Sequence, residues 1–291
     1  MKDKAKEYTV FWGCMIPFRH PQIEVAARIS LPTCGIKIFD AEGFTCCPDP
    51  WNMKASSLED WLTIAMRNLA VGESSSRDLI TLCNGCFSTL KEASHIFKNG
   101  GEACSAAKER ISRHGLSFKG NTNVFHVASV LAKLGSQVTS SVSRPLSGIR
   151  VAIHHGCHLL RPSSVVEFDD PFDPSLIENF ISSLGCEVVR YEGYTDCCGN
   201  ASRSQELSLS LAAKKCKAMK EAGADAIVVA CPACFEQFDI GQVEIRRRLG
   251  DDFSLPVLHI VQILALAQGV EPSSLGFDRH RTKVMPLLER I

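Results

Sequence analysis

The cysteines of this chain occur in two sets that repeat the same order along the sequence. Each set has a single cysteine, then an adjacent pair, then a Cys-x-x-Cys motif, so each set holds five sulfur atoms. The first set is Cys14, Cys46, Cys47, Cys83 and Cys86, and the second is Cys157, Cys197, Cys198, Cys231 and Cys234. A chain with this pattern needs a fold that brings distant cysteines together, once in each half of the chain.

The segments around the cysteines repeat as well. Residues 42–47 match residues 192–198, and residues 124–127 match residues 257–260. An internal duplication is the simplest explanation of two matching segments in the same order as the cysteines.

A stretch rich in serine, residues 136–147, separates the two halves and is typical of a linker. We therefore expect two domains, one spanning residues 1–147 and the other residues 148–291.

Short apolar runs lead into the cysteines and are typical of buried strands. The expected strands are residues 8–12, 36–39 and 78–82 in the first half and residues 149–153, 187–191 and 226–230 in the second. Strands that alternate with helices predict an α/β fold with two pseudo-symmetric domains, each a small, mostly parallel sheet flanked by helices. Because such sheets bind ligands at the carboxyl ends of their strands, each cysteine set is expected at one sheet edge.

Two helix starts are expected from capping boxes at Ser56-x-x-Glu59 and Ser202-x-x-Gln205. The second helix is expected over about residues 204–222, ending at Gly223. It would carry Leu207, Leu211 and Met219 near one face.

Composition and charge limit the classes of partner. Lys and Arg together number 32, and so do Asp and Glu, so the formal net charge is zero. This balance argues against nucleic acid as a partner, since phosphate binding requires clustered positive charge. No apolar run has the length of a membrane span, and the charged N-terminus does not resemble a signal peptide. We therefore expect a cytoplasmic protein, in which cysteines serve more often as metal ligands or redox groups than as disulfides.

Several kinds of cysteine chemistry remain open on spacing alone. A structural zinc ion takes four ligands, whereas each half offers five cysteines, and adjacent cysteines such as Cys46 and Cys47 make an awkward zinc clamp. A disulfide framework would need an oxidising compartment, and a thioredoxin-like dithiol would need only one Cys-x-x-Cys pair. Iron–sulfur clusters fit best, because five thiolates can serve several irons, although zinc and dithiol chemistry remain alternatives.

The complete motif resembles the CCG domain, and two copies in a chain of this length resemble the B subunits of heterodisulfide reductases from methanogenic archaea. The resemblance implies two noncubane [4Fe-4S] clusters, one bound by the five cysteines of each set. One departure from the motif is Pro48, which stands where Gly199 stands in the second copy. Proline fixes φ and lacks a backbone donor, so the first cluster loop is expected to differ in shape.

The resemblance also implies a reaction and partners. The substrate would be CoM-S-S-CoB, the mixed disulfide of coenzyme M and coenzyme B, reduced to two thiols in methanogenesis at a pocket between the halves. No flavin, nicotinamide or molybdenum site is recognisable, so electrons would come from a ferredoxin-like C subunit. The C subunit would in turn receive electrons from a flavin-containing A subunit, which is linked to hydrogenase or formate dehydrogenase.

Two other functions remain possible from the sequence. CCG domains also resemble parts of fumarate reductases, hydroxy-acid oxidases and other disulfide reductases. From another class, a zinc-stabilised scaffold subunit would also use paired cysteines.

Three histidines near Cys157, namely His154, His155 and His158, are candidate proton donors, because histidine titrates near neutrality. We expect His126 and His259, which occupy equivalent positions in apolar helical stretches, to pack in the core with one hydrogen bond each.

Trp12 and Trp51 are expected in the core as well. The four cysteines outside the repeat are expected to be small buried apolar residues, and they are Cys34, Cys104, Cys186 and Cys216.

Overall fold

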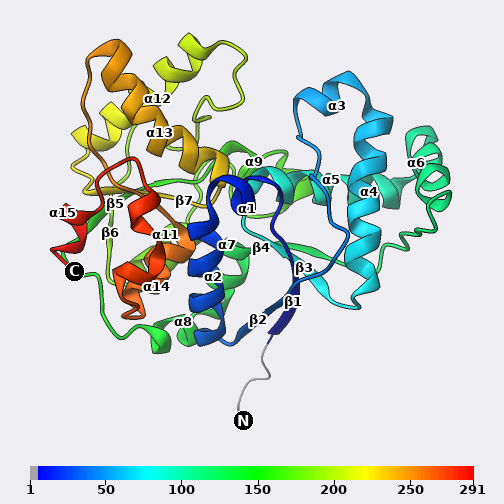
Figure 1. Ribbon diagram of the computed structural model, residues 1–291, viewed down its shortest axis with the longest axis horizontal. Helices are drawn as coiled ribbons and strands as arrows, with labels where there is room; N and C mark the ends of the chain where they lie inside the picture. The colour runs from blue at the N-terminus through cyan, green and yellow to red at the C-terminus, as the bar shows by residue number, and fades with distance from the viewer. Residues whose placement is uncertain (1–5) are drawn as a thin grey trace.

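The computed structural model describes residues 6–291 and contains two four-stranded sheets, all of whose strand pairs are parallel (Figure 1). The first sheet has the order β2-β1-β3-β4, built from β1 (Lys6–Phe11), β2 (Ile36–Phe39), β3 (Asp78–Thr81) and β4 (Val124–His126). The second has the equivalent order β6-β5-β7-β8, built from β5 (Arg150–His154), β6 (Glu187–Val188), β7 (Ala226–Val229) and β8 (Val257–His259). The predicted α/β fold with two pseudo-symmetric halves is confirmed.

Helices connect the strands and cover both sheets. Those of the first half are α1 (Met15–Arg19), α2 (Pro21–Thr33), α3 (Asn52–Ser56), α4 (Leu58–Ser74), α5 (Asn84–Asn99), α6 (Glu102–Ser112), α7 (Val127–Leu134) and α8 (Ser136–Ser141). Those of the second half are α9 (Cys157–Leu160), α10 (Ser163–Val166), α11 (Leu176–Ser183), α12 (Gln205–Glu221), α13 (Pro232–Leu249), α14 (Ile260–Ala267) and α15 (Met285–Leu288). Two 3₁₀ helices, Pro272–Leu275 and Phe277–Arg279, lie between α14 and α15.

The six expected strands form, but the sequence prediction missed the fourth strand of each sheet. β4 and β8 are three residues long and run directly into α7 and α14. Their sequences are apolar without alternation, a pattern that does not distinguish a short buried strand from the start of a buried helix. The expected strand at residues 187–191 shortens to the two residues of β6.

The expected helix caps are displaced. Ser57, not Ser56, caps α4 by accepting a hydrogen bond from the Asp60 amide, and Ser204, not Ser202, caps α12. The predicted face of α12 is confirmed only in part, because Met219 is buried but Leu207 is 52% exposed. The side chains that α12 buries are Leu209, Ala212, Lys215, Cys216 and Met219.

The helices of the two halves pack against each other in a reciprocal way. α2 of the first half contacts α14 of the second, and α11 of the second half contacts α7 of the first, as the neighbouring ribbons in Figure 1 show. Gln268, just past α14, donates a hydrogen bond to the Ser30 carbonyl of α2 at 3.1 Å. The two halves therefore bury apolar surface against each other and share one continuous core.

The stretch expected to be a linker is partly ordered, since α8 occupies its first residues. The segment between α8 and β5 contains the expected domain boundary after residue 147, which stays a prediction.

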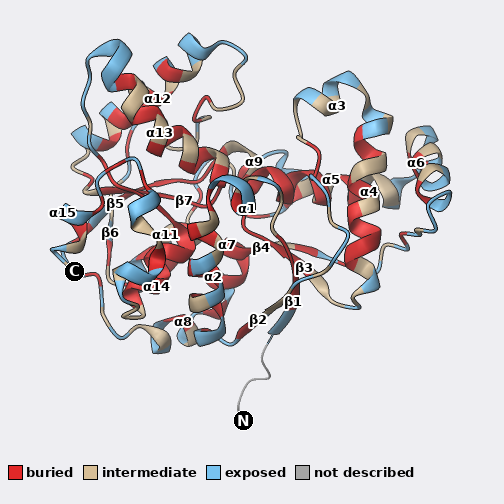
Figure 2. Ribbon diagram, in the orientation of Figure 1, coloured by how far each residue is buried: buried red, intermediate tan, exposed pale blue. Residues whose placement is uncertain are grey.

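The central strands of both sheets are largely buried (Figure 2). Val10, Ile80, Ala152 and Val228 in the central strands are at most 1% exposed. Across residues 6–291, no helix is both long enough and apolar enough to cross a membrane.

Candidate functional site

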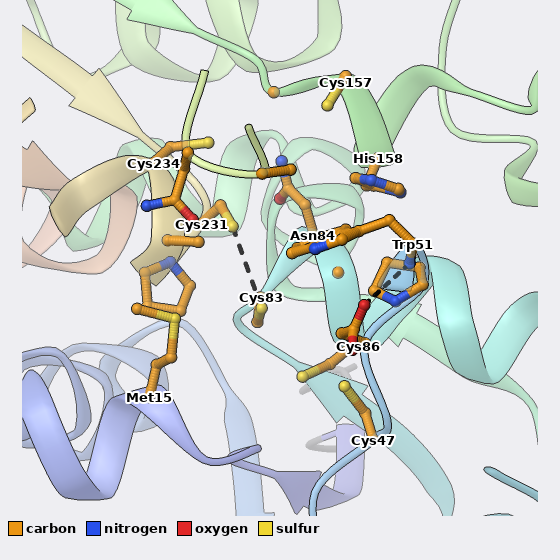
Figure 3. Close-up of a pocket in the computed structure, with 18 of the residues that line it drawn as sticks. Met15, Cys47, Trp51, Cys83, Asn84, Cys86, Cys157, His158, Cys231 and Cys234 are labelled. Carbon is orange, nitrogen blue, oxygen red and sulfur yellow. Dashed lines mark hydrogen bonds between the residues drawn. The ribbon is translucent and has the colours of Figure 1, made fainter. Parts of the chain in front are cut away.

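The ends of the central strands deliver the cysteines to one place. Cys14 follows β1 and Cys83 follows β3, while Cys157 follows β5 and Cys231 follows β7. The two Cys-Cys pairs come from the loops after β2 and β6. All ten cysteines of the two sets line a single cavity of about 150 Å³ between the halves. Figure 3 shows this cavity with some of the cysteines labelled.

Sulfur atoms from both sets approach one another within and across the halves. Cys14 and Cys46 Sγ are 4.0 Å apart, and Cys198 and Cys234 Sγ are 3.6 Å apart. None of the 14 cysteines forms a disulfide. Thiols at these distances from one another form a dense donor set for soft metals.

The two sets have the same gradient of burial. In each, the first cysteine and the first of the Cys-Cys pair are partly or fully exposed, and the other three are buried. Each set therefore reaches from the core to the cavity wall.

Neighbouring thiols shift one another's pKa values strongly. Hydrogen bonds from Cys46 and Cys86 lower the pKa of Cys47 to about 5, so a thiolate is stable there at neutral pH. In the second set, hydrogen bonds from Cys157 and Cys198 hold the pKa of Cys197 far below its usual range. Hydrogen bonds to neighbouring cysteines, burial and repulsion by neighbouring sulfurs raise the pKa values of the partner thiols Cys157 and Cys86. Several adjacent sulfurs therefore cannot all ionise without a cation among them.

Two glycines that the sequence interpretation missed make room for side chains that line the cavity. Gly13 and Gly156 each precede the first cysteine of a set, and both have positive φ, +70° and +82°. A Cβ on Gly13 would lie 2.7 Å from Cys86 Sγ. One on Gly156 would clash with Asn84 Nδ2, and its distance of 3.5 Å from Cys234 Sγ would be an ordinary contact. The signal was present in the repeat, because Gly-Cys occurs at the start of both sets.

Asn84 connects the halves beside the cavity. Its buried Nδ2 donates a hydrogen bond to the His155 carbonyl at 2.8 Å, and its Oδ1 has no hydrogen-bond partner. Its backbone amide, with the thiols of Cys234 and Cys83, also helps to hold the pKa of Cys231 well below its usual range.

The structure separates the three candidate histidines. His158 lines the cavity with its ring 5.2 Å from that of Trp51, and the two lie side by side in Figure 3. His154 is 1% exposed and His155 is fully buried, with Nε2 3.8 Å from a Glu178 carboxylate oxygen. Only His158 is therefore placed to meet a molecule in the cavity.

His126 and His259 end β4 and β8 rather than lying within helices, and they cap the helices that follow. The Nδ1 of His126 accepts from the Ala128 amide, and that of His259 accepts from the Val261 amide. His259 Nε2 also lies 3.2 Å from the Leu82 carbonyl of the other half. The expected packing role is confirmed, with the hydrogen bond made through a helix cap.

Trp12 and Trp51 were expected in the core, but both are half-buried and line the cavity. The four other cysteines are buried away from the cavity as expected, and they are Cys34, Cys104, Cys186 and Cys216.

The chemistry of the site fits iron–sulfur clusters. Ten thiols face one cavity, and Gly13 leaves space beside the buried sulfur of Cys86. Thiolates are the usual ligands of such clusters, and a tetrahedral zinc ion would leave one cysteine of each set unused.

Comparison with known proteins agrees with this donor set. The family model for the cysteine-rich CCG domain matches twice, at residues 8–91 and 151–239. The chain is 34% identical to the B subunit of the Ferredoxin/F(420)H(2)-dependent CoB-CoM heterodisulfide reductase of Methanosarcina acetivorans, over 97% of this chain and 96% of that protein. The chain belongs to the CCG-domain family of heterodisulfide reductase B subunits. Within this family it is also 36% identical to a protein of Archaeoglobus profundus named as similar to the heterodisulfide reductase B subunit, over 93% of each chain.

The family extends to proteins with other names. An 8-methylmenaquinol:fumarate reductase membrane anchor subunit of Wolinella succinogenes is 27% identical over 94% of this chain and 96% of its own length. A crystal structure of a hypothetical protein from Helicobacter pylori matches with a TM-score of 0.76 at 17% identity, covering 97% of this chain and 53% of that one. This last similarity concerns the fold alone.

Proposed function

We propose that this protein is the catalytic subunit of a heterodisulfide reductase, which reduces CoM-S-S-CoB to its two thiols. The observation that carries the proposal is that both five-cysteine sets line the same cavity. A disulfide placed there would be within reach of both sets, as reduction by two one-electron centres requires.

We further propose that each set holds a noncubane [4Fe-4S] cluster through all five of its cysteines. When bound, the clusters would supply one electron each and an iron atom for a substrate sulfur. The chain itself supplies the space that Gly13 leaves beside Cys86 Sγ, and largely apolar walls that include Trp12 and Trp51.

His158 is the proton donor in this proposal. Burial lowers the pKa of His158, while Cys231 and Cys197 act in the opposite direction. A negative product thiolate in the cavity would raise the pKa of His158. The imidazole therefore gains a proton as negative charge develops beside it, and it can then pass this proton to the sulfur.

Partners follow from the same proposal. Relatives are named as B subunits of heterodisulfide reductases, which supports a role within a multi-subunit complex. We propose that a ferredoxin-like C subunit is the electron donor and that a flavin-containing A subunit supplies it in turn. Hydrogenase or formate dehydrogenase would supply electrons to the A subunit. The protein would be located in the cytoplasm.

Metal analysis of protein purified without oxygen tests the clusters. We expect about eight irons per chain, four for each cluster, with matching sulfide and little zinc. Cys46→Ser and Cys197→Ser should each disrupt the signal of one half, whereas the buried control Cys104→Ser should leave both intact. A colourless protein that contains only zinc would overturn the proposal in favour of a scaffold.

A disulfide assay tests the reaction. With reduced viologen as donor, the iron-loaded protein should convert CoM-S-S-CoB into two thiols. Iron-loaded protein that accepts electrons but leaves the disulfide intact would instead support a role in electron transfer alone, as the similarity to the fumarate reductase relative allows.

A further inference from the structure

The two halves differ at a buried position directly behind the cysteines. Phe11 and His154 occupy the same place relative to the first cysteine of each set, on β1 and β5, and they pair with equivalent residues, Thr81 and Val229. Both side chains are at most 1% exposed. The first half thus places a hydrocarbon ring where the second places an imidazole.

The imidazole of His154 faces the second cysteine set. A ring nitrogen of His154 and the sulfur atoms of Cys198 and Cys234 all lie within 4.8 Å of one another. Nδ1 lies 3.4 Å from the Tyr191 hydroxyl, and Nε2 has no hydrogen-bond partner. The ring of Phe238, at 5.0 Å, fixes the orientation of the imidazole. A buried ring N–H without a partner is costly, and the thiolates of Cys198 and Cys234 are acceptors beside one of the two ring nitrogens.

Phe11 offers nothing comparable to the first set. Its ring packs edge-on against Phe44 with centroids 5.0 Å apart, and it has no polar atom.

A second difference lies on the helices that support the Cys-Cys loops. Asn68 on α4 and Lys215 on α12 stand at the same distance from the capping serines of these helices. Asn68 donates to the Cys46 carbonyl at 2.9 Å, and Lys215 donates to the Gly193 carbonyl at 2.5 Å. Both hold the loop in place, but only the lysine brings a positive charge.

This charge is buried next to the second set. Lys215 is 4% exposed, and it interacts electrostatically with the sulfurs of Cys197, Cys198 and Cys234. The carboxylate of Asp196 also faces it, but Asp196 is exposed and its charge is screened by water. The positive charge of Lys215 therefore acts on the three cysteines as well as on Asp196.

From these two differences we propose that His154 and Lys215 give the cluster of the second half a more positive midpoint potential than that of the first. This inference rests on the proposed function, because it requires a cluster in each half. Reduction adds negative charge to a cluster and its sulfur ligands. Hydrogen bonds to those sulfurs and a nearby buried cation stabilise the reduced form, which raises the potential.

Potentiometric titration under anaerobic conditions, followed by paramagnetic resonance, tests the inference. Signals are assigned to each half with Cys46→Ser and Cys197→Ser, and the wild-type midpoint of the second half should be the more positive. The variants His154→Phe and Lys215→Asn introduce the residues of the first half. At a fixed potential, each variant should lower the ratio of reduced to oxidised cluster in the second half about tenfold. This corresponds to a midpoint potential that is about 59 mV more negative. The midpoint of the first half should not move.

Conservative variants separate tuning from folding. His154→Gln keeps a donor and Lys215→Arg keeps the charge, so both should retain most of the wild-type potential with full iron content. Equal midpoints in the wild type, or unchanged midpoints in His154→Phe and Lys215→Asn, would overturn the inference. Loss of iron from the second half of His154→Phe would also overturn it, because His154 would then be a ligand. A wild-type chain without iron would refute the proposed function itself, and the inference with it.

Discussion

The sulfur atoms of Cys83 and Cys231 lie 4.0 Å apart, although the two residues are 148 positions apart in the sequence. Each begins a Cys-x-x-Cys motif at the carboxyl end of a strand, β3 or β7, and each is the N-cap residue of the following helix, α5 or α13. The two cysteine sets therefore meet at their Cys-x-x-Cys motifs, as Figure 3 shows. A molecule in the cavity contacts both halves at once, which is the reason for interpreting the sets as one site.

Asn84 should contribute measurably to the joining of the halves. Asn84→Ala removes the hydrogen bond to the His155 carbonyl and leaves a buried acceptor without a partner. We expect the free energy of unfolding to fall by about 1–3 kcal/mol, measured by urea denaturation. The control Asn99→Ala removes a contact of the exposed Asn99 with His95, and it should change stability by less than about 0.5 kcal/mol. Equal effects of the two variants would contradict the proposed role of Asn84.

Gly13 should be needed for metal binding by the first set. In Gly13→Ala the new Cβ would lie 2.7 Å from Cys86 Sγ, so this sulfur has to move. We expect iron content to fall by about half, since only the second set remains undisturbed.

Gly35→Ala is the matched control for this change. Gly35 has a similar φ of +74°, but no atom lies within 4 Å of the position that a Cβ would take there. Both substitutions therefore carry the same backbone cost of about 1 kcal/mol, and only Gly13→Ala adds the clash. If both variants lost iron equally, backbone strain rather than the position of Cys86 would be responsible.

The apolar runs and the cysteine repeat together predicted two parallel sheets and the gathering of each cysteine set at a sheet edge, but not the fourth strand of each sheet. Strand ends such as those before Cys83 and Cys231 are visible as apolar runs, and parallel sheets collect such ends at one edge. Helix caps were displaced by one or two residues, because several serines near each start can accept the same amide hydrogen bonds.

Tertiary contacts that leave no local signal could not be predicted. Lys215 follows Lys214 in a helix and has the sequence character of a solvent-facing residue, yet it is buried against the Cys-Cys loop. Trp51 has the size of a core residue, yet it lines the cavity beside His158. The burial of each depends on segments far away in the sequence, so periodicity within one helix or loop does not determine it.

Stability should depend on pH through His259. Burial lowers the pKa of His259 to about 4 in the folded protein, whereas an unfolded histidine titrates near about 6.5. Between these values the unfolded chain binds a proton that the folded chain does not. The contribution of His259 is therefore complete above about pH 6.5 and is lost as pH falls towards 4, at about 1.4 kcal/mol per pH unit.

A variant isolates this effect from other acid-sensitive groups. Urea unfolding between pH 7 and 5 should show a shallower loss of stability in His259→Gln than in the wild type. His95→Gln, at an exposed histidine, is the control for the substitution itself. A slope in His259→Gln equal to that of the wild type would mean that His259 does not titrate in this range.

His158 should affect turnover without affecting metal content. His158 lines the cavity beside Trp51, and its side chain is the only one of the three candidate histidines that reaches it. Removing a proton donor typically costs a factor of about 100 or more, so His158→Gln should slow disulfide reduction by at least about this factor near pH 7. Iron content and the paramagnetic signals should match the wild type, because the ten cysteines remain. The control His95→Gln should turn over normally, and wild-type turnover in His158→Gln would exclude His158 as the donor.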